Sequence, residues 1–545
     1  MADKRREADG YIQANFFMIA AGCLLLLYIY LLVGLYPFLI KPGYAETSVI
    51  KYGFLKAVSF GFRAGFFWIP TFIPLSLLSV LAGTLLYMKS TGKGIKDFVR
   101  SLHFSSTDIL AALYALFAVI SAAASPYRGN LLWGLELSEM GLVAQLLFVY
   151  IYFITSRLFD LDELKVLVYV SLVSSAVVSV IGILQRFGFD PFDLYHGLEN
   201  KLFISTIGQH TYFSAYLILF LVLGMFEAWI SEPGSMMYKA AILHLAIASC
   251  LPCILNADMI FSGLFIALSF LFVLSFESVE RMKAFLEIAL TILLTWRVTG
   301  IAWYLLTPEF RLEPLPKFIM QSPVLWIPVL LLALAYIFIR RKAGEKIRFD
   351  LTGYRYIGYI YAGLVGLAIL GLLVYIIFNT MQVLPEGLRS KANYLLFDPF
   401  WGNGRGAIWH DTVMSLIKEM KESPVTAVIG AGPDQFVHIL DEYVHDWLVI
   451  YTDKLAIYAH NEWLNAFVCC GLFGGMAYLG IFLSAIIRFV RNRKGAPVAL
   501  GAAVIAAAYL AHQMFGYQQY ISTPYVFLVL GIGEQAVRER RRGAA

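Results

Sequence analysis

A long polar stretch, residues 381–462, holds residue types suited to group transfer at a phosphate. Arg405 stands between two glycines ahead of a predicted helix, and His460 precedes Asn461 where apolar sequence resumes. A guanidinium offers phosphate a permanently charged, bidentate fork, and the following helix N-terminus adds unpaired N–H groups. A histidine with a pKa near 6.5 accepts a proton at neutral pH. The pattern predicts an anion clamp and a general base. An arginine reaching lipid headgroups and an interfacial histidine are the alternatives.

Three further charged residues border apolar runs. Arg186 follows Gln185 at the end of one run, where a second cation could reach a lipid-linked phosphate; an interfacial anchor is the simpler interpretation. Glu136 and Glu139 are expected early in a membrane span, within a turn of its outer end. A polar cavity and plain solvation explain these two carboxylates equally well.

Histidines of the long polar stretch raise the question of a metal. His410, His438 and His445 occur there among several Asp and Glu residues. Neither H-E-x-x-H nor paired C-x-x-C spacing is present, and the spacing from His438 to His445 matches no common zinc pattern. A solvated acidic surface is the favoured interpretation, so no metal site and no cofactor is predicted.

The composition defines the class of protein in which these residues work. Hydrophobic residues make up 60% of the 545 residues and charged residues 14%, against roughly 45–50% and 25% in globular chains. A soluble fold could not bury that much apolar surface. The sequence therefore predicts an all-α polytopic membrane protein and excludes a soluble enzyme, a disordered chain and a disulfide scaffold.

Apolar runs near 20 residues mark helices that cross a hydrocarbon core about 30 Å thick. About fourteen such spans are predicted. They cover residues 16–40, 64–88, 108–124, 134–156, 165–187, 207–230, 239–255, 258–276, 284–306, 322–340, 356–380, 463–487, 496–516 and 523–537.

Basic residues indicate the orientation of the spans. Their densest clusters are Arg340-Arg341-Lys342, Arg488 to Lys494 and Arg538 to Arg542. Because cytoplasmic segments carry the excess of Lys and Arg, both termini are predicted to be cytoplasmic and the long polar stretch to lie outside.

Four regions follow from this scheme. Residues 1–107 form two N-terminal spans and a basic cytoplasmic loop, and 108–380 form the transmembrane core. Residues 381–462 form one extracytoplasmic catalytic loop containing short helices, and 463–545 form the C-terminal spans and a basic tail. The loop is expected to fold because apolar residues recur at helical spacing between a Gly-rich turn and a proline. These are Trp409, Val413, Leu416, Ile417 and Met420, between Gly402-Asn403-Gly404 and Pro424.

Four short motifs follow one another around the long polar stretch. They are Gly404-Arg405-Gly406-Ala407-Ile408-Trp409, Gly430-Ala431-Gly432, His460-Asn461-Glu462-Trp463-Leu464 and Gly471-Leu472-Phe473-Gly474. This ordered set resembles the O-antigen ligase/polymerase superfamily of bacterial glycan-transferring membrane proteins, whose members show a G-R-x-x-x-W turn, a G-x-G turn, an H-N-x-x-L re-entry and a G-L-x-G helix in this order. The resemblance covers roughly residues 108–535. Each motif is weak alone, and the ordered set around one long outer loop is fairly specific.

The resemblance implies a function. Such proteins transfer a glycan from a polyprenyl-diphosphate carrier to a glycan, lipid or protein acceptor at the outer face of the bacterial inner (plasma) membrane. By the resemblance, His460 is the base that deprotonates the acceptor and Arg405 binds the diphosphate, with inversion at the sugar and no metal. Asn461 belongs to the same H-N motif and is expected to contact substrate. Membrane lipids are expected partners, and nucleic acid is not.

The sequence departs from the family in two places. The turn Asn256–Gly263 lacks the arginine that members often carry there, and Arg186 or Arg389 are the candidates to replace it. Gln209 and His210 stand where the family has a Gly-Asn pattern, and both are expected to bind substrate. These departures leave the donor and the carrier geometry open.

Other functions fit the same sequence. A chain-extending polysaccharide polymerase and a protein O-oligosaccharyltransferase share the proposed chemistry. A polysaccharide transporter or flippase would also have many spans, but it would be expected to show inverted repeats and broken helices at the midplane. No half-to-half symmetry is evident in the sequence.

Overall fold

The computed structural model describes all residues except 1, 65–66, 93, 136–137, 197, 199–201, 344–349, 444–445, 453–455 and 545. Its described residues are mainly helical. The first half contains α1 (Ala2–Tyr30), α2 (Tyr44–Phe60), α3 (Phe72–Thr91), α4 (Ile95–Ser101), α5 (Ser106–Ala124), α6 (Leu142–Leu158), α7 (Leu164–Arg186), α8 (His210–Ile230), α9 (Met236–Ala248), α10 (Leu251–Ile254) and α11 (Met259–Ser275).

The second half contains the remaining helices. They are α12 (Val279–Leu306), α13 (Pro314–Gln321), α14 (Trp326–Ala343), α15 (Arg355–Thr380), α16 (Trp401–Glu422), α17 (Pro424–Ile429), α18 (Phe436–Tyr443), α19 (Asp446–Tyr451), α20 (Glu462–Arg491), α21 (Pro497–His512) and α22 (Thr523–Ala544). Two short antiparallel hairpins accompany the described helices: β1 (Gly61–Ala64) pairs with β2 (Phe67–Pro70), and β3 (Phe203–Ile204) pairs with β4 (Gly208–Gln209).

Ten helical segments among the described residues are long and apolar enough to cross a membrane. Three shorter apolar helices, α6, α11 and α21, pack among them. Side chains on α15 face outward almost all round, which suits a helix whose solvent is lipid, because a helix satisfies its backbone groups internally. The chain is therefore an all-α polytopic membrane protein.

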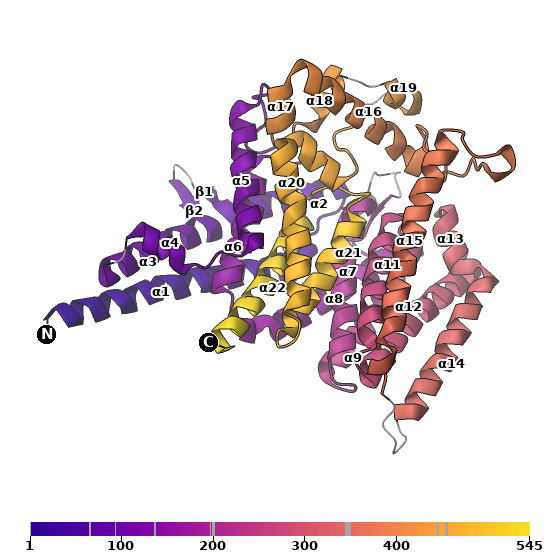
Figure 1. Ribbon diagram of the computed structural model, residues 1–545, viewed down its shortest axis with the longest axis horizontal. Helices are drawn as coiled ribbons and strands as arrows, with labels where there is room; N and C mark the ends of the chain where they lie inside the picture. Colours follow the sequence, from indigo (N-terminus) through magenta and orange to yellow (C-terminus); the bar gives the residue numbers. More distant parts are fainter. Residues whose placement is uncertain are drawn as a thin grey trace.

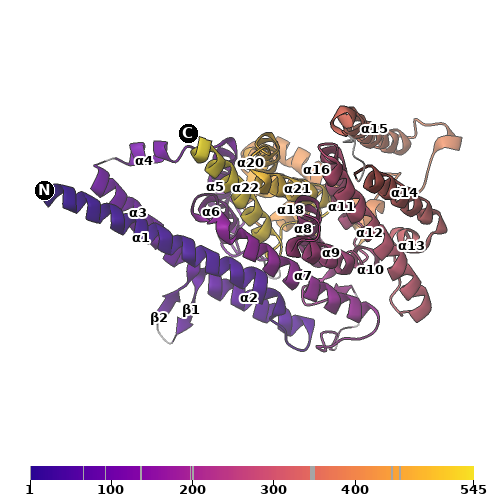
Figure 2. The same cartoon turned by 90° about the horizontal axis from the view of Figure 1, so that it is seen from below.

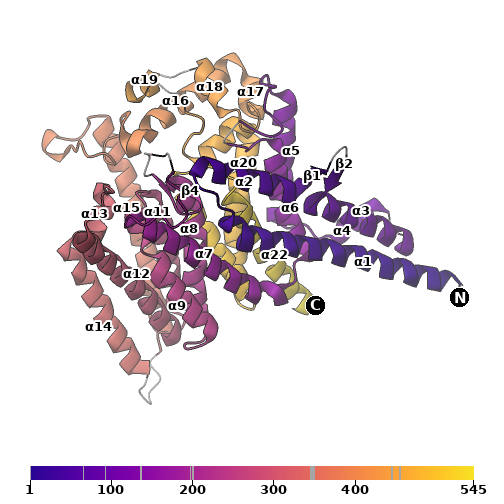
Figure 3. The same cartoon turned by 180° about the vertical axis from the view of Figure 1, so that it is seen from behind.

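The helices form an upright bundle with a cap at one end. Figure 1 shows α5, α8, α20 and α21 running roughly vertically, with α16–α19 across their upper ends. We call α16–α19 the cap helices; Figure 3 shows them from behind, above α5 and α20. Helix α8 is central, with nearly all of its side chains buried against α7, α9, α11 and α21.

Helices α1 and α3 form an arm beside the bundle. They pack along each other and extend away together, as Figure 2 shows from below. Helix α1 reaches the bundle through contacts with α6.

The start of the second predicted span is wrong. Residues 61–64 and 67–70 form the strands of the β1–β2 hairpin instead of helix, with Phe62 paired to Ile69. The helix begins at Phe72, after β2 ends at Pro70 and Thr71 takes the N-cap position, and Gly61 has a φ of +134° that helical residues do not adopt. Helix α2 was also not predicted, because Glu46, Lys51 and Lys56 make it too polar for a span.

The start of the predicted span 134–156 is wrong as well. Helix α6 begins only at Leu142, so Glu139 lies outside any helix, where it accepts a hydrogen bond from the Tyr52 hydroxyl at 2.6 Å. Glu136 lies outside the described residues. The loop follows a tight path at Gly134, whose φ is +97° and where a Cβ would lie 2.5 Å from a carboxylate oxygen of Asp434.

Asp434 ties the cap helices to this loop. Its carboxylate accepts hydrogen bonds from Leu135 N (2.7 Å), Ser138 Oγ (2.5 Å) and Met140 N (3.4 Å). All three bonds join segments about 300 positions apart in the chain. Asp434 is 5% exposed, so water does not replace a lost acceptor.

Replacing Asp434 with alanine is expected to lower the free energy of unfolding by about 2–4 kcal/mol, because three buried donors lose their acceptor. The measurement is thermal unfolding of the purified protein in detergent. Asp441→Ala is the matched control, since Asp441 is an exposed carboxylate of α18. Equal melting shifts for the two variants would contradict the anchoring role.

Candidate functional site

A left-handed turn presents Arg405 at the start of the regular part of α16. Gly402, Asn403 and Gly404 have φ values of 59°, 60° and 89°. A Cβ at Gly404 would lie 2.1 Å from the Tyr451 ring, and one at Gly406 would lie 1.9 Å from a backbone oxygen. Glycine at these two positions therefore lets the turn close against its neighbours.

The Arg405 side chain points from the cap toward the last helices of the bundle. Its Nε donates to the Phe515 carbonyl at 3.2 Å and its Nη1 to the Gly402 carbonyl at 2.7 Å. Its guanidinium lies 5.9 Å from the Phe515 ring centroid. Within the described chain Nη2 has no hydrogen-bond partner and Arg405 forms no direct ion pair, so donor capacity remains for a ligand.

Acidic and phenolic groups surround Arg405 at longer range. Asp258, Glu313 and Tyr394 all act electrostatically on it and partly offset the effect of burial, which lowers the pKa of Arg405. Burial raises the pKa of Asp258, and the Tyr394 hydroxyl, 3.0 Å from its Oδ2, opposes that rise together with Arg405. These groups thus partly balance the positive charge of Arg405 without forming a direct ion pair with it in the described chain.

His460 lies in the same site. Arg405 and His210 lie within electrostatic range of its imidazole. Burial is the main cause that lowers the pKa of His460 to about 3, and these two groups add to it. The imidazole is therefore neutral at physiological pH, the form that accepts a proton.

The backbone and neighbours of His460 hold it in an uncommon conformation. Its φ is +47°, which non-glycine residues seldom adopt. Its ring stands edge-on to Tyr517 at 5.0 Å, and the carbonyl of the preceding Ala459 accepts a hydrogen bond from Trp409 Nε1 at 3.0 Å. Neither ring nitrogen of His460 has a hydrogen-bond partner in the described part of the chain. Strain of this kind is often kept where it positions a functional group.

The start of α20 fixes the residues after His460. Asn461 caps the helix, since its Oδ1 accepts from Leu464 N at 3.0 Å. Fully buried Glu462 accepts hydrogen bonds from the hydroxyls of Tyr478 and Tyr509. The structure therefore gives Asn461 a capping role, and contact with substrate stays a prediction.

Gln209 and His210 open α8 beneath the cap. Gln209 Oε1 accepts from Thr211 N and Tyr212 N at 2.7 and 3.1 Å, so its acceptor is used in capping. His210 Nδ1 is buried without a hydrogen-bond partner among the described residues. His210 lies within electrostatic range of both Arg405 and Arg186, which makes it the better candidate of this pair for contact with a ligand.

Arg186 lies next to the turn that lacks an arginine. It is 3% exposed; its Nε donates to the Ile254 carbonyl at 2.9 Å and its Nη1 to the Tyr195 hydroxyl at 3.1 Å. Its guanidinium also stacks on Phe310, 3.9 Å from the ring centroid. Arg186 therefore brings a second positive charge to the Asn256–Asp258 turn and to His210.

Arg389 is not brought to the site. Its Nε and Nη2 donate to the carbonyls of Leu384 and Gln382, each at 2.7 Å, within its own exposed turn. It is not among the charged groups that mainly act on Arg405, His210 or His460. Of the two proposed substitutes for the missing arginine, the geometry favours Arg186.

The outward face of α16 lines an apolar cavity of about 570 Å³. Trp409, Val413 and Met414 contribute from α16, and Trp463 and Leu510 contribute from α20 and α21. Asn461, the neighbour of His460, also lines the cavity. The apolar side of α16 thus faces this cavity. On the opposite side of α16, Asp411 accepts hydrogen bonds from Trp447 N and Leu448 N and holds α19 in place.

The other histidines of the cap have aromatic neighbours. His410 stacks on Trp447 at 4.0 Å and contacts the Asp411 carboxylate at 2.8 Å, while His438 stacks on Tyr127 at 4.7 Å. His445 lies outside the described residues. In the part of the chain that is described, no group of three or more His, Cys, Asp or Glu side chains is arranged to hold a metal ion.

Sequence reasoning missed several members of the site. We call the following set the Arg405 cluster: Asp258, Glu313, Tyr394, Tyr517, His210, His460 and Arg405 itself. Asp258 was visible as a charge between two apolar runs, the one signal that could have found it. Glu313, Tyr394 and Tyr517 had no such signal, since each reaches the cluster only through packing.

No protein-family model matches the chain, and no curated protein matches it significantly.

Proposed function

We propose that the protein transfers a glycan from a polyprenyl-diphosphate carrier to an acceptor at the outer face of a bacterial plasma membrane, in the manner of an O-antigen ligase. The observation that carries this proposal is that a neutral His460 lies within electrostatic range of Arg405, whose Nη2 has no hydrogen-bond partner in the described chain. An apolar cavity lined by Asn461, the neighbour of His460, suits a lipid-linked substrate.

The proposed reaction uses each of these groups. Arg405 binds the diphosphate, and Arg186 and His210 extend the same polar region. His460 takes the proton from the acceptor hydroxyl or amide as that atom attacks the anomeric carbon. The bond from the anomeric carbon to the diphosphate breaks with inversion, and the diphosphate leaves as an anion whose developing charge Arg405 offsets. A diphosphate leaving group needs no acid partner, so no pair of catalytic carboxylates is required.

The proposal includes the orientation of the chain. We count the ten long segments, the three shorter apolar helices and α22 as fourteen spans, which adds four to the ten that are long and apolar enough to cross a membrane. The basic ends of α20 and α22 lie at the end of the bundle opposite the cap. By the positive-inside rule that end is cytoplasmic, as are both termini, and residues 381–462 are extracytoplasmic.

The direct test is transfer by the purified protein in lipid vesicles. A polyprenyl-diphosphate oligosaccharide is supplied with lipid, glycan or peptide acceptors, and the product is separated by mass. We expect transfer to one acceptor class; a glycan acceptor extended repeatedly would identify a polymerase. Absence of transfer to every class, with the donor intact, would contradict the proposal.

The pH dependence of the reaction should depend on whether the donor is bound. In the free protein the pKa of His460 is about 3, so the base remains neutral as pH falls and kcat/KM should be flat between about pH 5 and 8. A bound diphosphate places negative charge beside the imidazole and raises its pKa by about 1–3. The acid limb of kcat should therefore lie at higher pH than that of kcat/KM. A kcat/KM inflection near pH 6.5 would contradict this prediction.

A further inference from the structure

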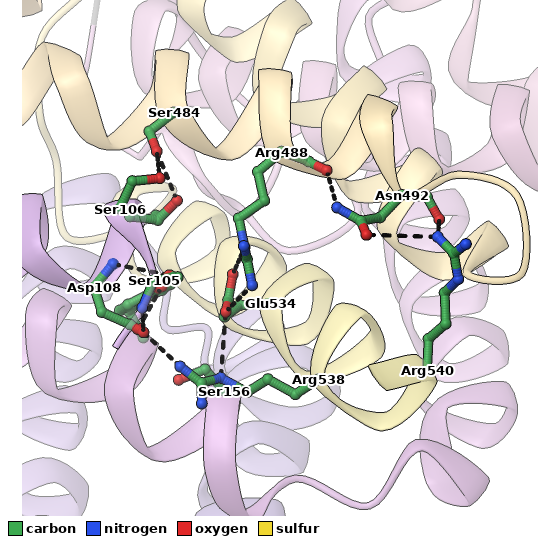
Figure 4. Close-up of polar contacts among 12 residues, drawn as sticks. Ser105, Ser106, Asp108, Ser156, Ser484, Arg488, Asn492, Glu534, Arg538 and Arg540 are labelled. Atoms are coloured by element: carbon green, nitrogen blue, oxygen red, sulfur yellow. Dashed lines mark hydrogen bonds and ion pairs between the residues drawn. The ribbon is translucent and has the colours of Figure 1, made fainter. Parts of the chain in front are cut away.

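The end of the bundle opposite the cap holds a buried network of charges. Asp108 and Glu534 are both fully buried. Arg488 binds Glu534 through two hydrogen bonds of 2.7 and 3.0 Å, and Arg538 contacts both carboxylates. Arg157 lies 3.4 Å from Asp108. Figure 4 shows Arg538 of α22 close to Glu534 and to Asp108 at the start of α5.

Local hydrogen bonds hold Asp108 in place independently of the arginines. Asp108 and Ser105 make a reciprocal capping box, with Ser105 N donating to Asp108 Oδ2 at 2.7 Å and Asp108 N donating to Ser105 Oγ at 3.2 Å. The carboxylate is therefore rigid, and the arginines gather around it.

Positive charge exceeds negative charge in this region. Arg157, Arg488 and Arg538 face two carboxylates, and two exposed residues, Arg541 and Arg542, line the same space. Glu539 lies near Arg542 but does not line that space. The side chains that line it therefore carry more positive than negative charge. Arg157 Nη2 is buried and has no hydrogen-bond partner among the described residues. A donor with no protein acceptor is thus present at the edge of the network.

An apolar cavity lies beside this charge network. It measures about 840 Å³ and is bounded by the α1–α3 arm and α6. Its walls include Met18 of α1, Val80 of α3, and Phe153 and Leu158 of α6. Arg157, Arg488, Arg538, Arg541 and Arg542 line the same cavity, so apolar walls and cationic groups share one space.

We propose that this cavity binds an anionic phospholipid from the membrane leaflet opposite the Arg405 cluster. The phosphodiester lies among Arg157, Arg541 and Arg542, and an acyl chain lies between the α1–α3 arm and α6. Basic pockets between membrane helices recognise anionic headgroups in this way. A soluble phosphate would leave the apolar walls unused, so the charge and the shape together select a lipid. The lipid fills the space between the arm and the bundle and holds the arm in place.

The test measures lipid binding by the purified full-length protein and does not depend on its activity. Native mass spectrometry compares phosphatidylglycerol with phosphatidylcholine, and glycerol phosphate serves as the soluble headgroup. We expect phosphatidylglycerol to bind more tightly than both other probes. Equal binding of the two lipids, or glycerol phosphate binding as tightly as phosphatidylglycerol, would overturn the proposal.

Two variants test the two parts of the site. The double variant R541A/R542A removes exposed cations that make no contact within the charge network, and we expect roughly fivefold weaker phosphatidylglycerol binding for each arginine lost. Thr84→Phe places a larger side chain in the cavity. It should weaken the binding of phosphatidylglycerol without affecting the binding of glycerol phosphate. R340A/R341A removes an exposed arginine pair on α14 and is the matched control. Unchanged phosphatidylglycerol affinity in R541A/R542A, or the same loss in R340A/R341A, would overturn the proposal.

Discussion

Replacing His460 with alanine is expected to slow glycan transfer by about 10²–10⁴-fold, the usual contribution of a general base. The reason is that the imidazole is neutral at physiological pH and has no hydrogen-bond partner in the described chain, so it is free to take the acceptor proton. The measurement is the transfer rate of the purified variant in vesicles at saturating donor. The KM for the donor should change little, because the base acts on the acceptor.

The backbone conformation of His460 requires a second substitution. With φ at +47°, alanine adds strain that could itself disturb the loop. Asparagine tolerates this region and lacks a comparable base, so His460→Asn separates the two effects. Both variants should be equally inactive while His438→Ala, a histidine of the cap that stacks on Tyr127 and does not line the apolar cavity, keeps its activity. Wild-type transfer by His460→Asn would remove His460 from the mechanism.

Replacing Arg405 with alanine is expected to lower kcat by about 10²–10³-fold, as removal of a positioned donor to a developing anion does elsewhere. The KM for the donor should rise as well, because the same guanidinium binds the diphosphate before and during the reaction. Arg405→Lys retains the charge but loses the planar fork, so it should recover only part of the activity. The measurement is steady-state kinetics with a polyprenyl-diphosphate donor.

Two comparisons distinguish a loss of catalysis in the Arg405 variants from a loss of folding. Arg405 also donates to the Phe515 carbonyl, so the melting temperature of each variant must be measured alongside its kinetics. Arg389→Ala removes an exposed arginine whose hydrogen bonds stay within its own turn, and it should behave like the wild type. Full activity in a folded Arg405→Ala protein, or an equal loss in Arg389→Ala, would contradict the assignment of Arg405.

The pattern of apolar runs predicted most helices and misjudged where some begin. The break between α9–α10 and α11 was correctly expected at Asn256–Asp258, since a merged helix would be too long for a bilayer. Residues 64–70 were expected to be helical because hydropathy cannot tell an exposed apolar hairpin from a helix end. Glu139 was expected inside a span because nothing local to it records that Asp434 ties its loop to the cap.

For the candidate site, local sequence identified the chemistry but not the full set of partners. The glycines around Arg405 and the position of His460 at the re-entry were readable, because turn geometry is a local property. The closeness of Asp258, Glu313 and Tyr394 to Arg405 was not readable, because it depends on how α11, α13 and the cap helices pack. The same packing decides that Arg186 lies beside the site and that Arg389 does not.

By itself the sequence determined the class of this protein and the long polar segment that carries Arg405 and His460. It could do so because transfer of a helix into hydrocarbon is set by the residues of that helix. Only the tertiary structure decided which charges meet. Arg405 with Asp258, and Arg538 with Asp108, come from segments more than 140 and 400 positions apart, and no periodicity along the chain encodes such contacts.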